Sequence, residues 1–586
     1  MNLIKNFKYT AVIAALGLGL TSCDDFLDRP AEDNYNDGTF YKTDEQCYQG
    51  VNYLYSSPWY DFQRGFIKVG EVLSGNMYWG SSPYLTFTLQ GTDEDLRNMS
   101  YSLWAAIGHS NTVYRNIGNA EGPSEAAKNA TRGEALTWKA MAYFYLVRTF
   151  GDVPIIHDNT SDIASGAYNS KFKVQRADVY EYIIMTLEKA MELLPKSAQK
   201  GRIDYYCAEG LLAKVYLTRA GLGQSGTRNQ DDLDMAAKLA KDVIDNSGRN
   251  LLPVYSDVFR LQNNESEESL IAWRWSAGRD PWTQQNTLQS DLAPVGFDEF
   301  GDCWGGYGGP SVDLQDAFGI DVIATSPDSR IDTDTRRKAS MMLPGDKYEY
   351  FWTNKGGFDV LRFCYDSEDY GKGGPGNWQS PTGAYNVKHL YGNGYDHESA
   401  LGVAAGNMFS QLATHILRLS DVYLIYAEAK LGNNSSTSDA DALSAFNAVR
   451  NRAIPGATPL TSIDFPTIWK ERRLELAGEG DRWYDFVRLS YYRMQDAINE
   501  IKSQRRNSYW NVDGLFKYYY KHGVWDISKA AEETEGGGQA GYDTDTPAPN
   551  VTASSFTLPF PSEDVVLNPN LMKDPIHEDV RELYAY

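Results

Sequence analysis

Two glutamates four residues apart, Glu475 and Glu479, have the type and spacing that could serve as an acid and a base. A helix would place both carboxylates on one face. The surrounding stretch, 469–488, mixes acids and arginines with leucines and aromatics at helical steps. Opposite charges three or four residues apart pair on a helix surface, each pair contributing about 0.2–0.5 kcal/mol. We therefore interpret these charges as ion pairs on a solvated helix face rather than as an active site.

Other catalytic signatures are absent from the sequence. It has no H-E-x-x-H, Walker loop, G-x-S-x-G or zinc-finger spacing, and its seven histidines include no i, i+4 pair. Asp543 and Asp545 could contact calcium, but their polar loop lacks the spaced ligands of an EF-hand, so no metal site and no cofactor are assigned and calcium binding stays open. A net charge of −23 repels phosphate backbones and argues against nucleic acid as a partner. The two facing carboxylates of a glycosidase can be neither recognised nor excluded among 78 acids.

Aromatic residues in glycine-rich loops, with polar side chains nearby, are the feature of the sequence that says most about a ligand site. A flat ring covers the apolar face of a sugar, and neighbouring polar side chains bind its hydroxyls, each stack adding on the order of 1 kcal/mol. Trp79 and Trp304 are the leading candidates, because small or glycine neighbours would leave their rings uncovered. The full set of predicted ligand-binding residues is Asp61, Asn76, Trp79, Tyr84, Trp282, Trp304, Tyr307, Arg362, Trp378 and Tyr395. Trp104, Trp138 and Trp483 fall on helical stripes and are expected in the core.

Two sets of paired helices must position these loops. Apolar stripes with small residues at helical spacing run through about 131–246 and again through about 415–489. Antiparallel pairs of this kind follow the tetratricopeptide plan and must stack to bury their stripes. We expect the two sets to meet in one mainly α, TPR-like superhelix. The region between them, about 250–407, lacks sustained helical periodicity and predicts short strands and long loops that carry the ligand site.

The N-terminus has the pattern of a lipoprotein signal. Lys5 and Lys8 precede an apolar run that is too short to span a bilayer. Leu20-Thr-Ser-Cys23 then fits a lipobox, which predicts removal of residues 1–22 and lipidation of Cys23. Several acyl chains would hold the protein on a membrane almost permanently. Export would permit disulfides among Cys47, Cys207, Cys303 and Cys364, although Cys207 lies in a helical apolar pattern that favours a buried thiol.

Several of these segments together resemble one family. Glu471-Arg-Arg, a Glu-rich turn and Arg482-Trp-Tyr-Asp-Phe-Val-Arg488 are similar to the C-terminal signature of the SusD/RagB family, the nutrient-binding lipoproteins of Bacteroidetes-type outer membranes. Gly478 and Asp481 depart from that signature, and two glycines so close together predict a loosened helix there. The resemblance touches residues 20–28, 148–154, 202–221, 416–431, 471–488 and 556–571.

The resemblance implies a function that fits the loop aromatics. It implies a single SusD-like domain over 23–586, anchored by lipid at the cell surface of the outer membrane. Such a protein would capture oligosaccharide or polysaccharide and deliver it to a SusC-like TonB-dependent transporter, without catalysis. A peptide-binding member of the same family and a surface glycosidase are the alternatives. The sequence does not specify which glycan is bound.

Overall fold

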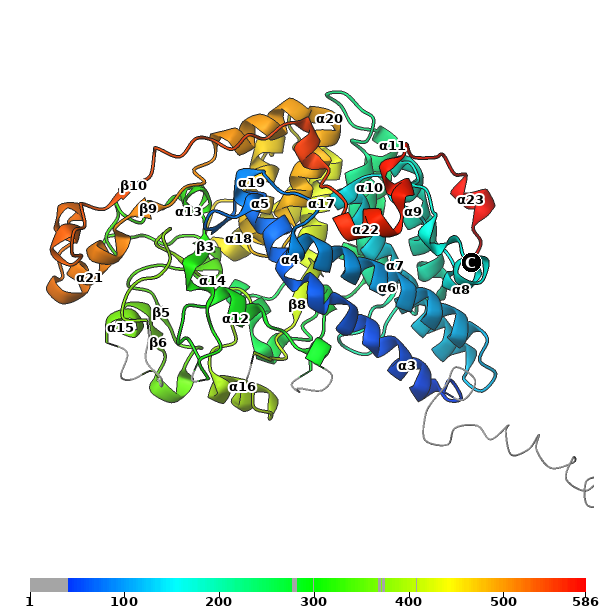
Figure 1. Cartoon of the computed structure of the whole chain (residues 1–586), viewed down its shortest axis with the longest axis horizontal. Coiled ribbons are helices and arrows are strands. Elements are labelled where there is room, and N and C mark those ends of the chain that lie inside the picture. Colours follow the sequence, from blue (N-terminus) through cyan, green and yellow to red (C-terminus); the bar gives the residue numbers. More distant parts are fainter. Residues whose placement is uncertain (1–39, 277–281, 299, 367–369, 371–374, 407) are drawn as a thin grey trace, which may run out of the picture.

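The chain is mainly helical, as the sequence predicts. The structure is a computed structural model that describes residues 40–276, 282–298, 300–366, 370, 375–406 and 408–586. Figure 1 shows long helices packed side by side on one side of the molecule and short elements joined by loops on the other. Cys23 and the predicted signal, 1–22, lie outside the described residues. No helix within the described ranges is long and apolar enough to cross a bilayer.

The early helices begin at capping side chains and pack in sequence order. Ser124 caps the first turn of α7 and Asp204 caps that of α10, each accepting a backbone N–H. Consecutive members of the set contact one another. The helices are α6 (Glu94–Gly118), α7 (Glu125–Phe150), α9 (Arg176–Leu193), α10 (Tyr205–Arg219) and α11 (Gln230–Asn246). The set therefore starts earlier than predicted, because α6 precedes residue 131.

The late helices continue this stack. They are α17 (Leu419–Leu431), α18 (Ala440–Ala453), α19 (Phe465–Leu476) and α20 (Arg482–Ser503). Helix α17 packs against both α10 and α11, so the two sets meet despite their separation in sequence. Lys214 of α10 pairs with Asp421 of α17 at 2.8 Å, and Arg472 of α19 pairs with the same carboxylate at 2.6 Å. Buried charge thus joins the two sets as well as apolar contact.

The family-like stretch is not one helix. The helical path is interrupted between α19 and α20, where Gly478 and Gly480 have φ values of 81° and 72°. The η3 π-helix (Lys68–Val72) packs at this break, and a side chain on its Gly70 would meet the Gly480 carbonyl oxygen at 2.3 Å. The predicted loosening is confirmed, and the break lets an N-terminal segment approach closely.

The charges of this stretch are buried, so the prediction of a solvated helix face is wrong. Glu475 is fully buried and pairs with Arg452 at 2.6 Å and Arg418 at 3.2 Å. Glu479 accepts from Arg418 and from Lys388, both at 2.7 Å. Burial alone would raise the pKa of Glu475, but these guanidinium groups outweigh burial and lower it to about 2. Both carboxylates are therefore held ionised within a network of cations, which does not fit an acid and a base.

The region between the helix sets has the predicted short strands, and others lie outside it; all the described strands form two-stranded antiparallel ladders. The pairs are β1 (Met77–Trp79) with β3 (Gly308–Pro310), β2 (Ser269–Trp273) with β8 (Thr414–Arg418), β4 (Met341–Met342) with β7 (Tyr385–Asn386), β5 (Lys347–Tyr348) with β6 (Phe358–Asp359), and β9 (Tyr509–Trp510) with β10 (Gly541–Tyr542). Short helices that the sequence does not predict lie here and around the core. They are α3 (Asp44–Asn52), α4 (Gln63–Ile67), α5 (Pro83–Thr86), α8 (Asn159–Ser165), α12 (Leu288–Leu292), α13 (Val312–Ala317), α14 (Thr335–Ser340), α15 (Val360–Tyr365), α16 (Gly394–Leu401), α21 (Val512–His522), α22 (Ser562–Leu567) and α23 (Val580–Leu583).

The cysteines, the core tryptophans and Asp543 can also be compared with the predictions from sequence. Cys207 is a buried thiol, as predicted, and Cys47, Cys303 and Cys364 are also free and buried. Trp138 and Trp483 are fully buried, and Trp104 packs partly buried against the same core. The Asp543 carboxylate accepts from the Asp545 N–H and the Thr546 hydroxyl, both at 2.8 Å, and so closes its own turn.

Candidate functional site

Strand pairing brings the two leading aromatic loops together. β1 and β3 run antiparallel with Trp79 opposite Gly308, so Trp79 lies beside the loop that carries Trp304 and Tyr307. A side chain on Gly308 would meet the Trp79 ring at 3.5 Å, which shows that the ring lies against the glycine backbone. Trp304 is 43% exposed and Tyr307 is 64% exposed. Two segments more than 200 residues apart are thus brought together by one strand pair.

A buried carboxylate fixes the ring of Trp304. Its indole Nε1 donates to Oδ1 of Asp291 at 2.9 Å. Asp291 belongs to α12 and also receives two bonds from the Arg64 guanidinium, at 2.9 and 3.1 Å. This hydrogen-bonded pair raises the pKa of Arg64, so the fork stays charged. Asp291 thus holds the edge of the indole, while Trp304 stays 43% exposed.

Trp304 lines a cleft of about 340 Å³, which we call the tryptophan cleft. Its described lining is Tyr60, Asp61, Gln63, Arg64, Asp95, Asn98, Thr287, Asp291, Trp304 and Met408. Asp61, a predicted hydroxyl partner, therefore lies in the same cleft as Trp304. Partial burial raises the pKa of Asp61. An aromatic face beside an amide, a hydroxyl, a guanidinium and carboxylates matches the apolar faces and hydroxyl rim of a sugar.

Trp79 is connected to this cleft through Lys68. The Lys68 amine pairs with Asp95, a lining residue, and lies 5.5 Å from the centroid of the Trp79 ring. The same amine lies 5.9 Å from the Tyr84 ring. Tyr84 itself is fully buried, and its hydroxyl donates to Asp93 at 2.6 Å. The structure gives Tyr84 a supporting position below the surface instead of the exposed one predicted.

Two further predicted residues are buried. Asn76 donates to Glu71 at 3.0 Å and accepts from Arg473 at 2.8 Å, which uses its amide inside the protein. Trp378 stacks on Tyr385 at a centroid distance of 4.5 Å and meets the edge of Phe516. Neither side chain is exposed to a ligand. Their glycine-rich neighbourhoods predict open loops, but Arg473 and Phe516 from distant segments, together with the nearby Glu71 and Tyr385, enclose them.

The remaining predictions are not gathered at the tryptophan cleft. Tyr395 on α16 and Arg362 on α15 are exposed but do not line it. Trp282 begins η7 (Trp282–Gln284), and its side chain lies outside the described part of the structure. Sequence reasoning missed Arg64, Lys68, Asn98 and Asp291. No local pattern marks these four, because their role depends on partners elsewhere in the chain.

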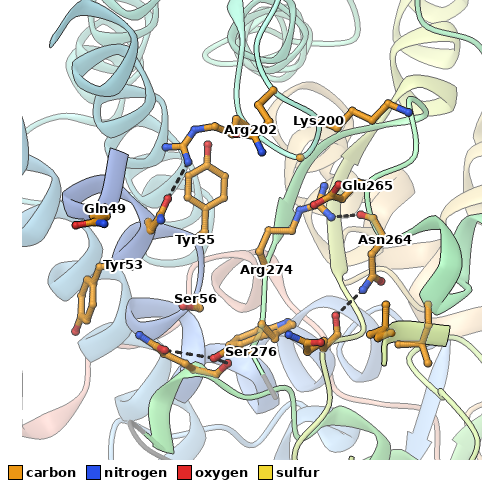
Figure 2. A pocket seen from close by; sticks show the side chains of 18 of the residues that line it. Gln49, Tyr53, Tyr55, Ser56, Lys200, Arg202, Asn264, Glu265, Arg274 and Ser276 are labelled. Atoms are coloured by element: carbon orange, nitrogen blue, oxygen red, sulfur yellow. Dashed lines mark hydrogen bonds between the residues drawn. The ribbon is translucent and has the colours of Figure 1, made fainter. Parts of the chain in front are cut away.

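A second, larger cleft holds none of the predicted residues. Its volume is about 880 Å³, and Figure 2 shows its walls. Asparagine and glutamine side chains are numerous around it, so we call it the amide cleft. The amides are Gln49, Asn52, Gln199, Gln262, Asn264, Gln284 and Gln411.

Comparison with known proteins agrees with this architecture. A model of the SusD family matches residues 300–577, and a second, described as starch-binding associating with outer membrane, matches residues 25–217. A SusD-like protein of Bacteroides ovatus is 34% identical over 577 residues, covering 96% of this chain and 97% of that protein. A crystal structure with xylogluco-oligosaccharide shares 30% identity and a TM-score of 0.75, covering 92% of this chain and 99% of that chain. Surface glycan-binding protein A from Bacteroides thetaiotaomicron, in complex with laminarihexaose, has the same fold at 17% identity and a TM-score of 0.61, covering 89% of this chain and 97% of that one.

The stacked helices and the loop-borne cleft define a mainly helical scaffold that carries irregular loops. The chain belongs to the SusD family.

Proposed function

We propose that this chain is a cell-surface glycan-binding lipoprotein that captures oligosaccharides or polysaccharide at the surface of Trp79, Trp304 and Tyr307. The observation that carries the proposal is the β1–β3 pairing, which places Trp79 beside the loop of the exposed Trp304 and Tyr307, while Trp304 lines the polar tryptophan cleft. The relatives solved with xylogluco-oligosaccharide and laminarihexaose support it.

Binding at this surface needs no covalent step. Ring faces replace water on the C–H faces of the sugar, and Asp61, Asn98 and Arg64 exchange hydrogen bonds with its hydroxyls. Each stack adds on the order of 1 kcal/mol, and the Asp291 contact pre-orients Trp304, which lowers the ordering cost. Several such contacts give weak but specific capture of a flexible oligomer.

A double variant, Trp304→Ala with Tyr307→Ala, tests the site. Retardation of the protein in gels that contain each member of a polysaccharide panel measures binding, and release of reducing ends measures hydrolysis. We expect the parent to be retarded by at least one glycan without hydrolysis, and the double variant to lose most of that retardation. Both side chains are exposed, so the fold should remain intact.

Tyr168→Ala is the matched control, because Tyr168 on η4 (Ala167–Asn169) is 61% exposed and lies outside the tryptophan cleft. Retardation equal in the double variant and the parent would contradict the assigned surface. Peptide binding with no glycan binding would favour a peptide-binding member of the family. Hydrolysis abolished by replacing one carboxylate would establish a glycosidase.

We further propose that lipid on Cys23 anchors the protein in the outer membrane and that it hands its ligand to a SusC-like TonB-dependent transporter. The lipobox and the description of the second matching family support this proposal. Labelled fatty acid should enter the parent and not Cys23→Ala, and the variant should leave the membrane fraction. Co-purification of a TonB-dependent transporter with the parent tests the partnership.

A further inference from the structure

The amide cleft differs from the tryptophan cleft in its charge. Its described lining contains three cationic side chains, Lys200, Arg202 and Arg274, and one acid, Glu265. Figure 2 shows these four at the same end of the cleft, with Tyr53 and Ser276 toward the other end. The chain as a whole carries a net charge of −23, so this local excess of cations is opposite in sign to the whole molecule.

Backbone geometry brings the cations together. Lys200 and Arg202 flank Gly201 in the loop between α9 and α10. A side chain on Gly201 would meet Nη2 of Arg274 at 3.1 Å, so this loop lies directly on the Arg274 guanidinium. Gly201 has a φ of 84°, which favours glycine. The absence of a side chain at this position lets three charges share one wall.

Only one of the three cations is matched by a close carboxylate. Arg202 forms a two-bond fork with buried Glu134, at 3.0 and 2.8 Å, and its third bond goes to Asn52. Arg274 donates to the Asn264 carbonyl, its Nε is buried without a partner, and it makes no ion pair with any described residue. Lys200 is exposed and likewise pairs with no acid in the described part of the chain. Glu265 lies near Arg274, beyond ion-pair distance, and offsets its charge only in part.

Several buried arginines elsewhere in this protein have their partners inside the fold. Arg418 and Arg336 each have two or more carboxylate partners, and Arg506 donates to three backbone carbonyls. Arg274 differs because it lines an open cleft, donates to one carbonyl and has an Nε without a partner, so an anion in the cleft can complete its site. We propose that the amide cleft binds the anionic substituent of an acidic sugar, with Lys200 and Arg274 as charged donors and the amides as partners of its hydroxyls. A uronate carboxylate and a sulfate ester share the chemistry that these donors recognise.

One segment of the chain contributes to both clefts. Tyr55 and Ser56 line the amide cleft, and Tyr60 and Asp61 of η2 (Ser57–Phe62), which follows them directly, line the tryptophan cleft. The Thr283 hydroxyl of η7 donates to Ser57 of this segment at 3.3 Å. We extend the proposal to one glycan chain that stacks on the rings and places a charged residue in the amide cleft. This extension to a single chain rests on the proposed function, whereas anion recognition by the amide cleft does not.

Calorimetric titration of the mature protein tests the proposal with matched probes. The probes are a xylo-oligosaccharide, the same oligomer bearing one glucuronate, a sulfated oligosaccharide of similar length, and inorganic sulfate. We expect Lys200→Glu to weaken binding of the glucuronate-bearing oligomer about tenfold or more and to leave the neutral oligomer unchanged. Glu265→Gln should strengthen binding of the charged oligomer, and added salt should weaken it. Lys238→Glu is the control, because Lys238 is an exposed lysine of α11 outside the cleft.

The same titrations in the Trp304→Ala/Tyr307→Ala background separate this proposal from the proposed function. If the ring surface fails as a glycan site but the charged oligomer still binds through Lys200, the amide cleft stands alone. A response to inorganic sulfate equal to that of the charged oligomers would show an anion site without sugar recognition and would overturn the proposal. Equal affinity for neutral and charged oligomers, or no effect of either Lys200→Glu or Glu265→Gln, would also overturn it. Preference between the glucuronate and sulfate probes identifies which anion the cleft takes.

Discussion

Carboxylates have different roles in the helical stack and in the tryptophan cleft. Around Glu475 each acid contacts several cations, and the whole group lies out of solvent. In the tryptophan cleft Asp291 is also buried, but its partners are the exposed Arg64 and the edge of the exposed Trp304. The first arrangement locks helices from separate parts of the chain together. The second fixes one edge of a ring and leaves its face open, so similar hydrogen bonds give rigidity in one region and ligand access in the other.

The largest expected effect is on the helical stack. Glu475→Ala leaves Arg418, Arg452 and Arg336 without one of their shared acids in a buried site. We expect the free energy of unfolding to fall by about 3–5 kcal/mol, measured by urea denaturation. Glu192→Ala, which breaks an exposed pair with Lys189, should change it by less than about 0.5 kcal/mol. A loss below about 1 kcal/mol for Glu475→Ala would mean that the network does not hold the stack together.

Acid should weaken the stack through the same carboxylates. The pKa of Glu475 is lowered from 4.5 to about 2 and that of Asp421 from 3.8 to about 2, because neighbouring cations outweigh burial. Groups with a lowered folded pKa stabilise the protein fully above their unfolded pKa and lose that contribution as pH falls through the folded pKa. The free energy of unfolding should therefore fall from about pH 5 toward pH 2. In Glu475→Gln this fall should be shallower, and an unchanged slope would exclude Glu475 as a source of the pH dependence.

In the tryptophan cleft, Asp291→Ala should affect binding more than folding. Trp304 and Arg64 would lose their shared partner but could still reach water, so the free energy of unfolding should change by about 1 kcal/mol. Without a fixed ring edge, affinity for the glycan identified by the retardation panel should fall about tenfold. Asp316→Ala is the control, because Asp316 pairs with half-exposed Arg505 outside the cleft. If Asp291→Ala costs several kcal/mol of stability and no affinity, Asp291 belongs with the structural carboxylates.

The sequence predicts the helical stack well because its information is local. Apolar stripes mark the helices, and the glycines at 478 and 480 mark the break between α19 and α20. Burial of the charged stretch 469–488 could not be predicted from local sequence in the same way. Alternating acids and arginines are typical of a solvated face, and only the approach of Arg418, Arg452 and Lys388 from other elements makes Glu475 and Glu479 internal.

The candidate site could be predicted only where the exposure of a side chain depends on its neighbours in sequence. Glycines around Trp304 and Tyr307 do leave the rings uncovered, and β1 places Trp79 beside them. The same signal failed at Trp378, where Phe516 and Tyr385 from other segments cover the ring. Asp291 and Arg64 are separated by 227 positions, so no sequence motif could have predicted their ion pair.

The smallest expected effect distinguishes two roles for Lys68, which are support of the Trp79 ring and direct contact with the ligand. The Lys68 amine lies over Trp79 and pairs with Asp95, so it can hold the ring without being replaced by a sugar. A cation–π contact at a half-exposed site contributes about 0.5–1 kcal/mol, so Lys68→Gln should reduce glycan affinity about twofold to fivefold. Lys68→Arg keeps the charge and should restore most of that loss, whereas Trp79→Ala should remove the benefit of either cation. If Lys68→Arg binds as weakly as Lys68→Gln in the same titration, the amine acts by direct contact with the ligand and not through the ring.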